Sequence, residues 1–188
     1  MRIHDRLDKI LELIQSDSFL EGKGLGNDIG FYIFDYDPKE ELLVRDHIKY
    51  LKDKLNTNTS ATKIIEFDLF EMLLEILRSE RVLEVIPSLE AEQGPEYILE
   101  AIRDLASPEV YVSMIDGKTE GYQIVFLTGV GKVWPIVRSH NILNNLHHIL
   151  ENIPVIMFFP GSFDGTGLRL FGKINDDNYY RAFPLVAK

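Results

Sequence analysis

Four short apolar runs are separated along the chain by stretches in which apolar residues recur every three or four positions. The runs cover residues 30–36, 63–67, 122–127 and 154–159. Short runs rich in aromatic and β-branched residues are typical of strands, and the periodicity between them is typical of amphipathic helices. Strands joined through helices pair in parallel by right-handed crossovers. The pattern therefore predicts an α/β fold, a three-layer sandwich with a mostly parallel central sheet.

The expected helices lie between these runs and before the first of them. They cover residues 2–15, 38–55, 68–77, 95–105, 108–116 and 135–151. Pro38 suits the first turn of a helix, where no amide hydrogen is needed. Asp68, followed three residues later by Glu71, matches a capping box. Every pair of consecutive strands is thus separated by at least one helix, as a parallel sheet requires.

The end of the chain has a different pattern. Two further runs of strand type, residues 168–171 and 179–183, are separated by the polar turn 175–178. This link is too short for a parallel crossover. We therefore expect a C-terminal antiparallel hairpin at one edge of the sheet.

Length and composition restrict the classes of protein. A chain of 188 residues is expected to form one domain, residues 1–188. It has no cysteine, which excludes disulfides, thiolate zinc sites and a cysteine nucleophile. The first residues have no apolar signal segment, and the longest apolar run, residues 155–159, is far shorter than the ~20 residues of a membrane span. We therefore expect a cytoplasmic protein that does not bind membranes.

Charge is distributed unevenly. Residues 1–121 hold 26 acidic and 14 basic residues, a net charge of −12, whereas residues 122–188 hold four acidic and six basic residues, a net charge of +2. An acidic chain without a basic run lacks the electrostatic footprint of a duplex DNA binder. A basic or neutral protein partner for the N-terminal part is the expected interaction, although the acidic charge can also serve solubility alone.

The loop Thr128–Lys132 joins an expected strand to an expected helix and contains two glycines and a lysine. Such a degenerate P-loop-like or Rossmann-like arrangement suits a phosphate, which makes Gly129, Gly131 and Lys132 candidates for an anion site. A working P-loop needs a glycine where Phe126 stands and a hydroxyl where Val133 stands. NTP hydrolysis is therefore not expected, and the loop is either a remnant anion site or a tight structural turn.

The helix expected after this loop is unusually rich in asparagine and histidine. Arg138, Asn141 and Asn145 share one face, whereas an apolar stripe is expected to face the sheet. The stripe consists of Ile136, Leu143, Leu146 and Leu150. Asparagine is a poor helix former, so its repeated use needs a compensating contact. The amide-rich face is either a protein interface or a set of internal hydrogen bonds to neighbouring loops.

Ligands of parallel α/β sheets bind beyond the carboxyl ends of the strands. That rim is expected to carry Asp35, Asp68 and the segments 128–132 and 161–165. Its carboxylates, Asp164 among them, either bind a cation, act as acid and base, or cap helices and turns. We prefer caps and turns.

Metal binding and cofactors are not expected. His140 and His148 lie eight residues apart, about 12 Å along a helix, which is too far to share one ion. The sequence contains neither the Gly-x-Ser-x-Gly motif of a serine nucleophile nor the His-Glu-x-x-His motif of a zinc-binding helix. We therefore expect no catalytic residues, no metal and no cofactor.

Three separated motifs resemble the BrxB family. They lie at residues 23–36, at residues 126–146 around the glycine loop and the asparagine-rich helix, and at residues 159–161 together with 176–183. The resemblance implies a small core component of BREX, a bacterial and archaeal anti-phage defence system. It further implies an assembly or adaptor role, with the alkaline-phosphatase-like protein PglZ as the first expected partner. It supplies no catalytic residues.

The resulting hypothesis is a non-enzymatic adaptor that acts in phage resistance through protein–protein interaction. The alternative is a nucleotide- or phosphate-sensing subunit that uses the loop Thr128–Lys132. The two hypotheses differ at Lys132, because a sensor needs its ammonium group whereas an adaptor needs only the fold.

Overall fold

The computed structural model describes residues 1–20, 30–150, 153–176 and 182–187. Its centre is a parallel sheet in the strand order β2-β3-β4-β1-β7. The strands are β1 (Phe31–Tyr36), β2 (Ile64–Asp68), β3 (Ile124–Thr128), β4 (Val155–Phe163) and β7 (Phe183–Pro184). The predicted α/β fold with a mostly parallel sheet is confirmed. β1, β3 and the first six residues of β4 are buried throughout, as their apolar sequences require.

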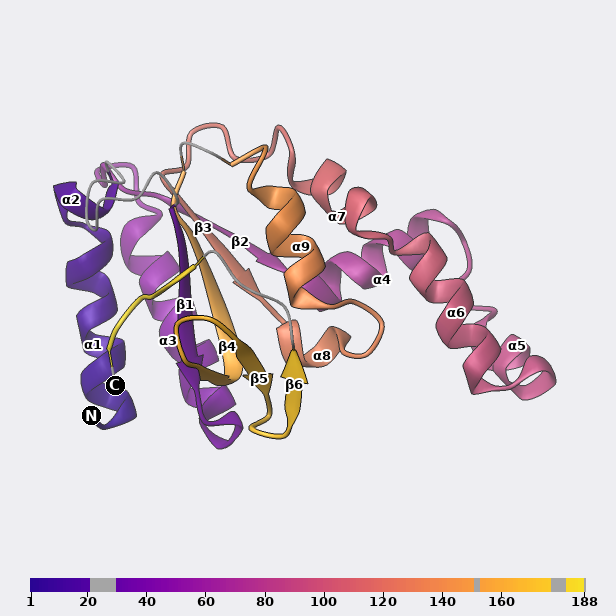
Figure 1. Cartoon of the computed structure of the whole chain (residues 1–188). Coiled ribbons are helices and arrows are strands. Elements are labelled where there is room, and N and C mark those ends of the chain that lie inside the picture. The colour runs from indigo at the N-terminus through magenta and orange to yellow at the C-terminus, as the bar shows by residue number, and fades with distance from the viewer. Residues whose placement is uncertain (21–29, 151–152, 177–181, 188) are drawn as a thin grey trace.

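Helices cover both faces of the sheet, as Figure 1 shows. One face carries α1 (Ile3–Ile14), α2 (Asp17–Leu20) and α3 (Glu41–Leu55), the last preceded by the 3₁₀ turn η1 (Pro38–Glu40). The other face carries α4 (Leu69–Ser79), α7 (Pro108–Ile115), α8 (Val130–Val133) and α9 (Ser139–Leu146). α6 (Pro95–Leu105) and α5 (Ile86–Gln93) extend away from the sheet.

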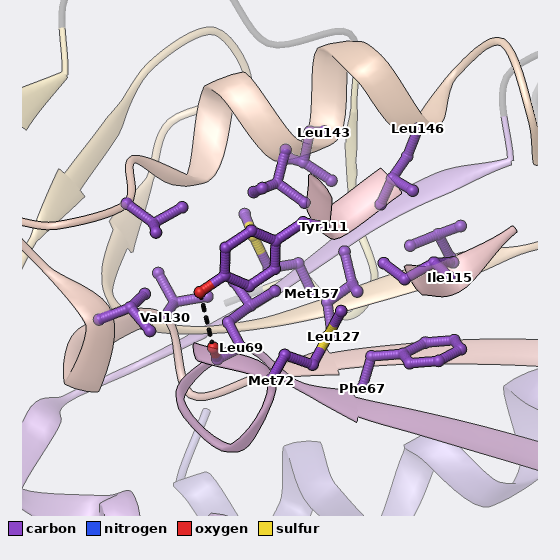
Figure 2. Close-up of a cluster of buried hydrophobic side chains, with 14 of the residues drawn as sticks. Phe67, Leu69, Met72, Tyr111, Ile115, Leu127, Val130, Leu143, Leu146 and Met157 are labelled. Carbon is purple, nitrogen blue, oxygen red and sulfur yellow. Dashed lines mark hydrogen bonds between the residues drawn. The ribbon is translucent and has the colours of Figure 1, made fainter. Parts of the chain in front are cut away.

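Alternate residues of each strand enter two separate cores. In β1, Phe31 and Ile33 pack under α4, α7 and α9, whereas Tyr32 and Phe34 pack under α1 and α3. Figure 2 shows the first of these cores around Tyr111, whose hydroxyl donates to the backbone oxygen of Leu69 at 3.1 Å. Burial raises the pKa of Tyr111, with a smaller contribution from Asp68. The period of two along the strands thus fills both layers.

The helix expected over residues 135–151 is wrong in its extent. The chain forms the single turn α8, leaves helical geometry at Trp134, and starts α9 only at Ser139. Proline disfavours helical geometry in the residue before it, which accounts for the end of α8 at Trp134. Residues 135–138 are not helical, so α9 begins later than expected, and it ends at Leu146. Arg138 is also extended and stands at the N-cap of α9. The loop after β3 is therefore followed by one helical turn and not by a long helix.

The expected C-terminal antiparallel hairpin is confirmed, and its first strand is where the sequence predicts it, but the second strand and the turn lie earlier than expected. β5 (Leu168–Leu170) pairs with β6 (Ile174–Asp176) around a turn at residues 171–173. β5 also pairs with the extended end of β4. Most of the strand expected at 179–183 lies outside the described residues, and Phe183 belongs to β7, which pairs in parallel with β1.

Candidate functional site

A cavity of about 260 Å³ opens at the carboxyl ends of β1, β2 and β3, on the side of α3. Polar and charged side chains dominate its wall. They are Tyr36, Glu41, Arg45, Lys49, Lys52, Glu66, Asp68, Thr128 and Lys132. This is the place at which parallel α/β sheets bind ligands. Its volume is below the ~300–1,000 Å³ of typical small-molecule pockets.

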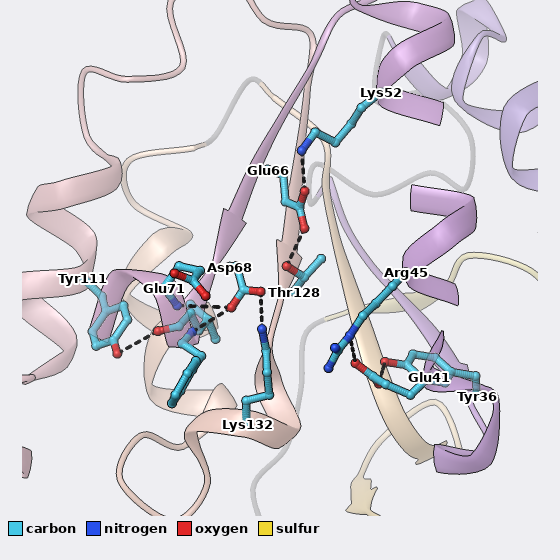
Figure 3. A network of polar contacts seen from close by, with 12 residues as sticks. Tyr36, Glu41, Arg45, Lys52, Glu66, Asp68, Glu71, Tyr111, Thr128 and Lys132 are labelled. Carbon is cyan, nitrogen blue, oxygen red and sulfur yellow. Dashed lines mark hydrogen bonds and ion pairs between the residues drawn. The ribbon is translucent and has the colours of Figure 1, made fainter. Parts of the chain in front are cut away.

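Lys132 points into this cavity and forms an ion pair with Asp68, as Figure 3 shows. Oδ1 of the same carboxylate accepts hydrogen bonds from the amides of Phe70 at 2.9 Å and Glu71 at 3.3 Å, which caps α4. The predicted capping role of Asp68 is confirmed. An internal carboxylate therefore occupies the position next to Lys132 that an external anion would need.

The glycines of the loop are explained by close packing. Gly129 has a φ of +75°, and a Cβ there would overlap Oδ1 of Asp68. A Cβ at Gly131 would lie 2.9 Å from the ring of Phe171. These contacts account for both glycines as parts of a tight structural turn, one of the two interpretations of this loop, and the anion site at Gly129, Gly131 and Lys132 stays a prediction.

Two further groups of side chains pair within the cavity wall. Glu66 accepts from Lys52 at 2.6 Å and from the hydroxyl of Thr128 at 2.7 Å. Glu41 accepts from the hydroxyl of Tyr36 at 2.6 Å and from Nε of Arg45 at 2.7 Å. Burial, reinforced by Glu41, raises the pKa of Tyr36, so this phenol stays protonated. The three carboxylates of the wall are thus each bonded to a cation of the same wall.

The other rim carboxylates have structural partners. Asp37 caps η1 by accepting from the amide of Lys39 at 3.0 Å. Asp164 accepts from the amides of Gly167 and Thr166 at 2.8 and 2.9 Å, and these bonds lower its pKa to about 2. The preferred interpretation as a turn residue is confirmed for Asp164, and Asp37, directly after β1, is likewise a cap. Asp35 differs, because it forms a buried ion pair with Arg6.

The structure places the predicted interface residues on α9 and its N-cap. Arg138 is exposed, whereas Asn141 and Asn145 are half-buried. Nδ2 of Asn145 donates to the backbone oxygen of Asn141 at 2.7 Å, a bond within the helix itself. Of the expected apolar stripe, Leu143, Leu146 and Leu150 are buried and Ile136 is partly buried. The stripe faces the sheet as predicted, and the interface itself stays a prediction.

Two exposed aromatic residues that border α8 were not singled out in the sequence. Trp134 is 41% exposed and Phe171 is 38% exposed. The signal for Trp134 was the Trp-Pro pair, which ends a helix. The signal for Phe171 was the following Gly172, which marks a turn.

The described residues include neither a metal-binding cluster nor a membrane-spanning helix. They contain no group of three or more side chains able to hold a metal ion. Within the same part of the chain, no helix is both long and apolar enough to cross a membrane.

Comparison with known proteins identifies one family. The family described as "BREX protein BrxB" matches residues 65–185. A BREX protein BrxB of Bacillus cereus (strain H3081.97) is 53% identical over 191 residues, which cover 100% of this chain and 99% of the relative. A BREX protein BrxB of Escherichia coli O9:H4 (strain HS) is 33% identical over 183 residues, which cover 96% of this chain and 90% of the relative. No solved structure matches this chain.

Proposed function

The chain belongs to the BrxB family of BREX proteins, and from this we infer that it is a non-enzymatic core or adaptor component of a cytoplasmic BREX complex. A role in BREX defence follows from the family. The adaptor role is our proposal, and it means that the chain acts by holding other BREX proteins together. PglZ is the first partner that we propose.

The observation that carries the non-enzymatic part of this proposal is the pairing of Lys132 with Asp68. A nucleotide-binding lysine must be available to a phosphate, whereas this ammonium group is held by a carboxylate that also caps α4. The same carboxylate occupies the space beside Gly129 that a side chain would need. These contacts favour a structural role for the loop, and they support the proposal that the protein acts through its surface.

The purified protein is expected not to hydrolyse ATP or GTP. Phe126 and Val133 replace groups that P-loop chemistry requires, and Lys132 is already paired. The measurement is phosphate release by the wild type and by Lys132→Ala at equal concentration. Turnover above background that is lost in Lys132→Ala would contradict the adaptor proposal and favour the phosphate-sensing alternative.

Tight binding of bare duplex DNA at physiological salt is also not expected. The chain carries a net charge of −10, and binding to duplex DNA depends on neutralising phosphates with clustered cations. Fluorescence anisotropy with a labelled duplex at two salt concentrations measures this. Submicromolar binding that weakens steeply with salt would show that the protein contacts nucleic acid directly.

Affinity purification from cells that express the complete BREX operon tests the adaptor role itself. The tagged chain should recover at least one other BREX protein, identified by mass spectrometry, with PglZ expected first. A tagged unrelated acidic protein of similar size is the control. Recovery of no BREX protein would overturn the proposed function.

The amide face of α9 provides a variant pair for the same experiment. Asn141→Ala and Asn145→Ala should leave the free energy of unfolding within about 0.5 kcal/mol of the wild type, because alanine's higher helix propensity offsets the lost bond within the helix. If this face contacts a partner, the variants should recover less of it. Unchanged recovery with an intact melting transition would place the interface elsewhere.

A further inference from the structure

In the turn between β5 and β6, Phe171 has a backbone conformation that is unfavourable for a bulky side chain. Phe171 and Gly172 have φ values of +54° and +69°, and the amide of Lys173 donates to the backbone oxygen of Leu170 at 3.0 Å. Positive φ at both central residues is the pattern of a type I′ turn, which favours Asn-Gly. A bulky residue with positive φ is an outlier. The turn alone therefore does not explain a phenylalanine at this position.

The ring of Phe171 lies over α8 and remains 38% exposed. It contacts the backbone at Gly131, where a Cβ would come within 2.9 Å of it. Trp134, immediately after α8, is 41% exposed. Two large aromatic side chains thus border one helical turn and leave much of their surface in water.

A hollow of about 120 Å³ lies between the segment after α8 and the β5–β6 hairpin, and it is lined by Trp134 and by Leu170, the residue before Phe171. It is lined by Val130, Trp134, Val137, Arg138, Phe159, Leu170, Ile174 and Asn175. The volume is about four times the ~30 Å³ share of a water molecule. It suits one apolar side chain and is far below the ~300–1,000 Å³ of a small-molecule pocket.

Arg138 lines this hollow, and its guanidinium is accessible to a partner. It is exposed, and its guanidinium has no hydrogen bond or ion pair within the described part of the chain. Among the described residues that line the hollow, Arg138 is the one charged side chain, and none is acidic. Charge complementarity at this surface therefore selects an acidic partner.

We propose that Trp134, Arg138 and Phe171 form a docking surface for an acidic segment of another protein. The segment inserts one apolar side chain into the hollow between Trp134 and Leu170, and it places a carboxylate against Arg138. Tryptophan and arginine dominate binding hot spots because they combine large buried area with directed polar contacts. The proposal rests on the adaptor function above and names the chemistry of the partner.

The test uses the tagged full-length chain expressed with the complete BREX operon, and it measures how much of each identified BREX protein is recovered. Trp134→Ala and Arg138→Glu should each reduce recovery of one BREX protein at least about 10-fold, in the range of hot-spot losses. Arg138→Ala should reduce it less than Arg138→Glu, and 0.5 M NaCl should weaken the wild-type complex. Tyr97→Ala, at a 53% exposed aromatic on α6, and Arg2→Glu, at the exposed N-cap arginine of α1, are the matched controls.

Phe171→Asn separates binding from folding. Asparagine accepts positive φ, so the melting temperature should stay within about 3 °C of the wild type or rise, since 1 kcal/mol corresponds to about 2–4 °C at this size. Recovery of the partner should nevertheless fall. If this variant fails to fold, Trp134→Ala and Arg138→Glu, both at exposed positions, still decide the question.

The outcomes distinguish this proposal from the one on which it rests. Failure of the wild type to recover any BREX protein overturns both proposals. Recovery by the wild type together with unchanged recovery by Trp134→Ala and Arg138→Glu overturns the docking surface and leaves the adaptor role standing. Equal recovery by Arg138→Ala and Arg138→Glu, without salt dependence, overturns the acidic partner. If these variants change the oligomeric state of the purified chain, the surface binds a second copy of this chain. That result would also overturn the proposal of an acidic partner.

Discussion

Replacing Arg6 by methionine will lower the free energy of unfolding by about 3–5 kcal/mol, the range for removing one partner of a buried ion pair. The side chains of Arg6 and Asp35 are 6% and 7% exposed, and Nη2 of Arg6 lies 2.9 Å from Oδ1 of Asp35. Arg6 also donates to the backbone oxygens of Asp35 at 2.6 Å and Val186 at 3.3 Å. Its loss leaves a buried carboxylate and two carbonyl groups without this donor.

The same ion pair connects segments that are far apart in the sequence. Oδ2 of Asp35 accepts from the amide of Phe163 at 2.8 Å, and the guanidinium of Arg6 lies 4.6 Å from the ring centre of Phe34. The pair therefore holds α1, β1, the end of β4 and the C-terminal segment together. Figure 1 shows α1 and that C-terminal segment side by side.

Urea unfolding of Arg6→Met measures this effect, with Arg2→Met as the matched control. Arg2 pairs with Asp5 on the same helix, but its side chain is 85% exposed, so its loss should change the free energy of unfolding by less than about 1 kcal/mol. The double variant Arg6→Met/Asp35→Asn should lose less than the sum of the single variants, because no charge is left unpaired. Equal effects of Arg6→Met and Arg2→Met would contradict the role assigned to the buried pair.

Gly129→Ala is expected to destabilise the protein by about 2–5 kcal/mol. A left-handed conformation costs an L-residue about 1–2 kcal/mol, and overpacking typically adds about 1–3 kcal/mol. Gly129 has a φ of +75°, and a Cβ there would overlap Oδ1 of Asp68 and lie 3.0 Å from its Cγ. Because that carboxylate caps α4 and pairs with Lys132, its displacement weakens both contacts.

Gly117→Ala is the control that isolates the backbone contribution. Gly117 has nearly the same φ, +73°, but a Cβ there would meet nothing within 4 Å. The free energy of unfolding of Gly117→Ala should therefore fall only by the cost of the left-handed conformation, about 1–2 kcal/mol. Thermal melts of the two variants give the difference, which reports the packing against Asp68. Equal losses would mean that Asp68 does not hold the loop.

Much of the helical layer was predictable because its periodicity is local. The apolar positions of α1, α3 and α4 recur within single segments, so burial of one face follows from spacing alone. The length of α9 was less predictable. Pro135 suits the first turn of a helix and the residues after it are periodic, which favours one helix over 135–151, yet α9 spans only Ser139–Leu146.

The candidate site was predictable in part. Strand ends and the Asp68 cap placed the rim at the correct edge of the sheet. The pairing of Lys132 with Asp68 was not predictable, because the two residues are 64 positions apart in the sequence. Each of them could equally have bound an external ligand. The exposed pair Trp134 and Phe171 was also missed, since apolar residues in short runs are usually buried.

By itself, the sequence determined the class of fold, because strand-type runs alternating with amphipathic helices have few ways to bury their apolar faces other than a covered parallel sheet. It also determined the family, through motifs distributed along the chain. Only the tertiary structure decided which charges meet. Arg6 with Asp35 and Lys132 with Asp68 are brought together by strand order and helix placement, and these depend on the packing of the whole chain and not on the spacing of residues within one segment.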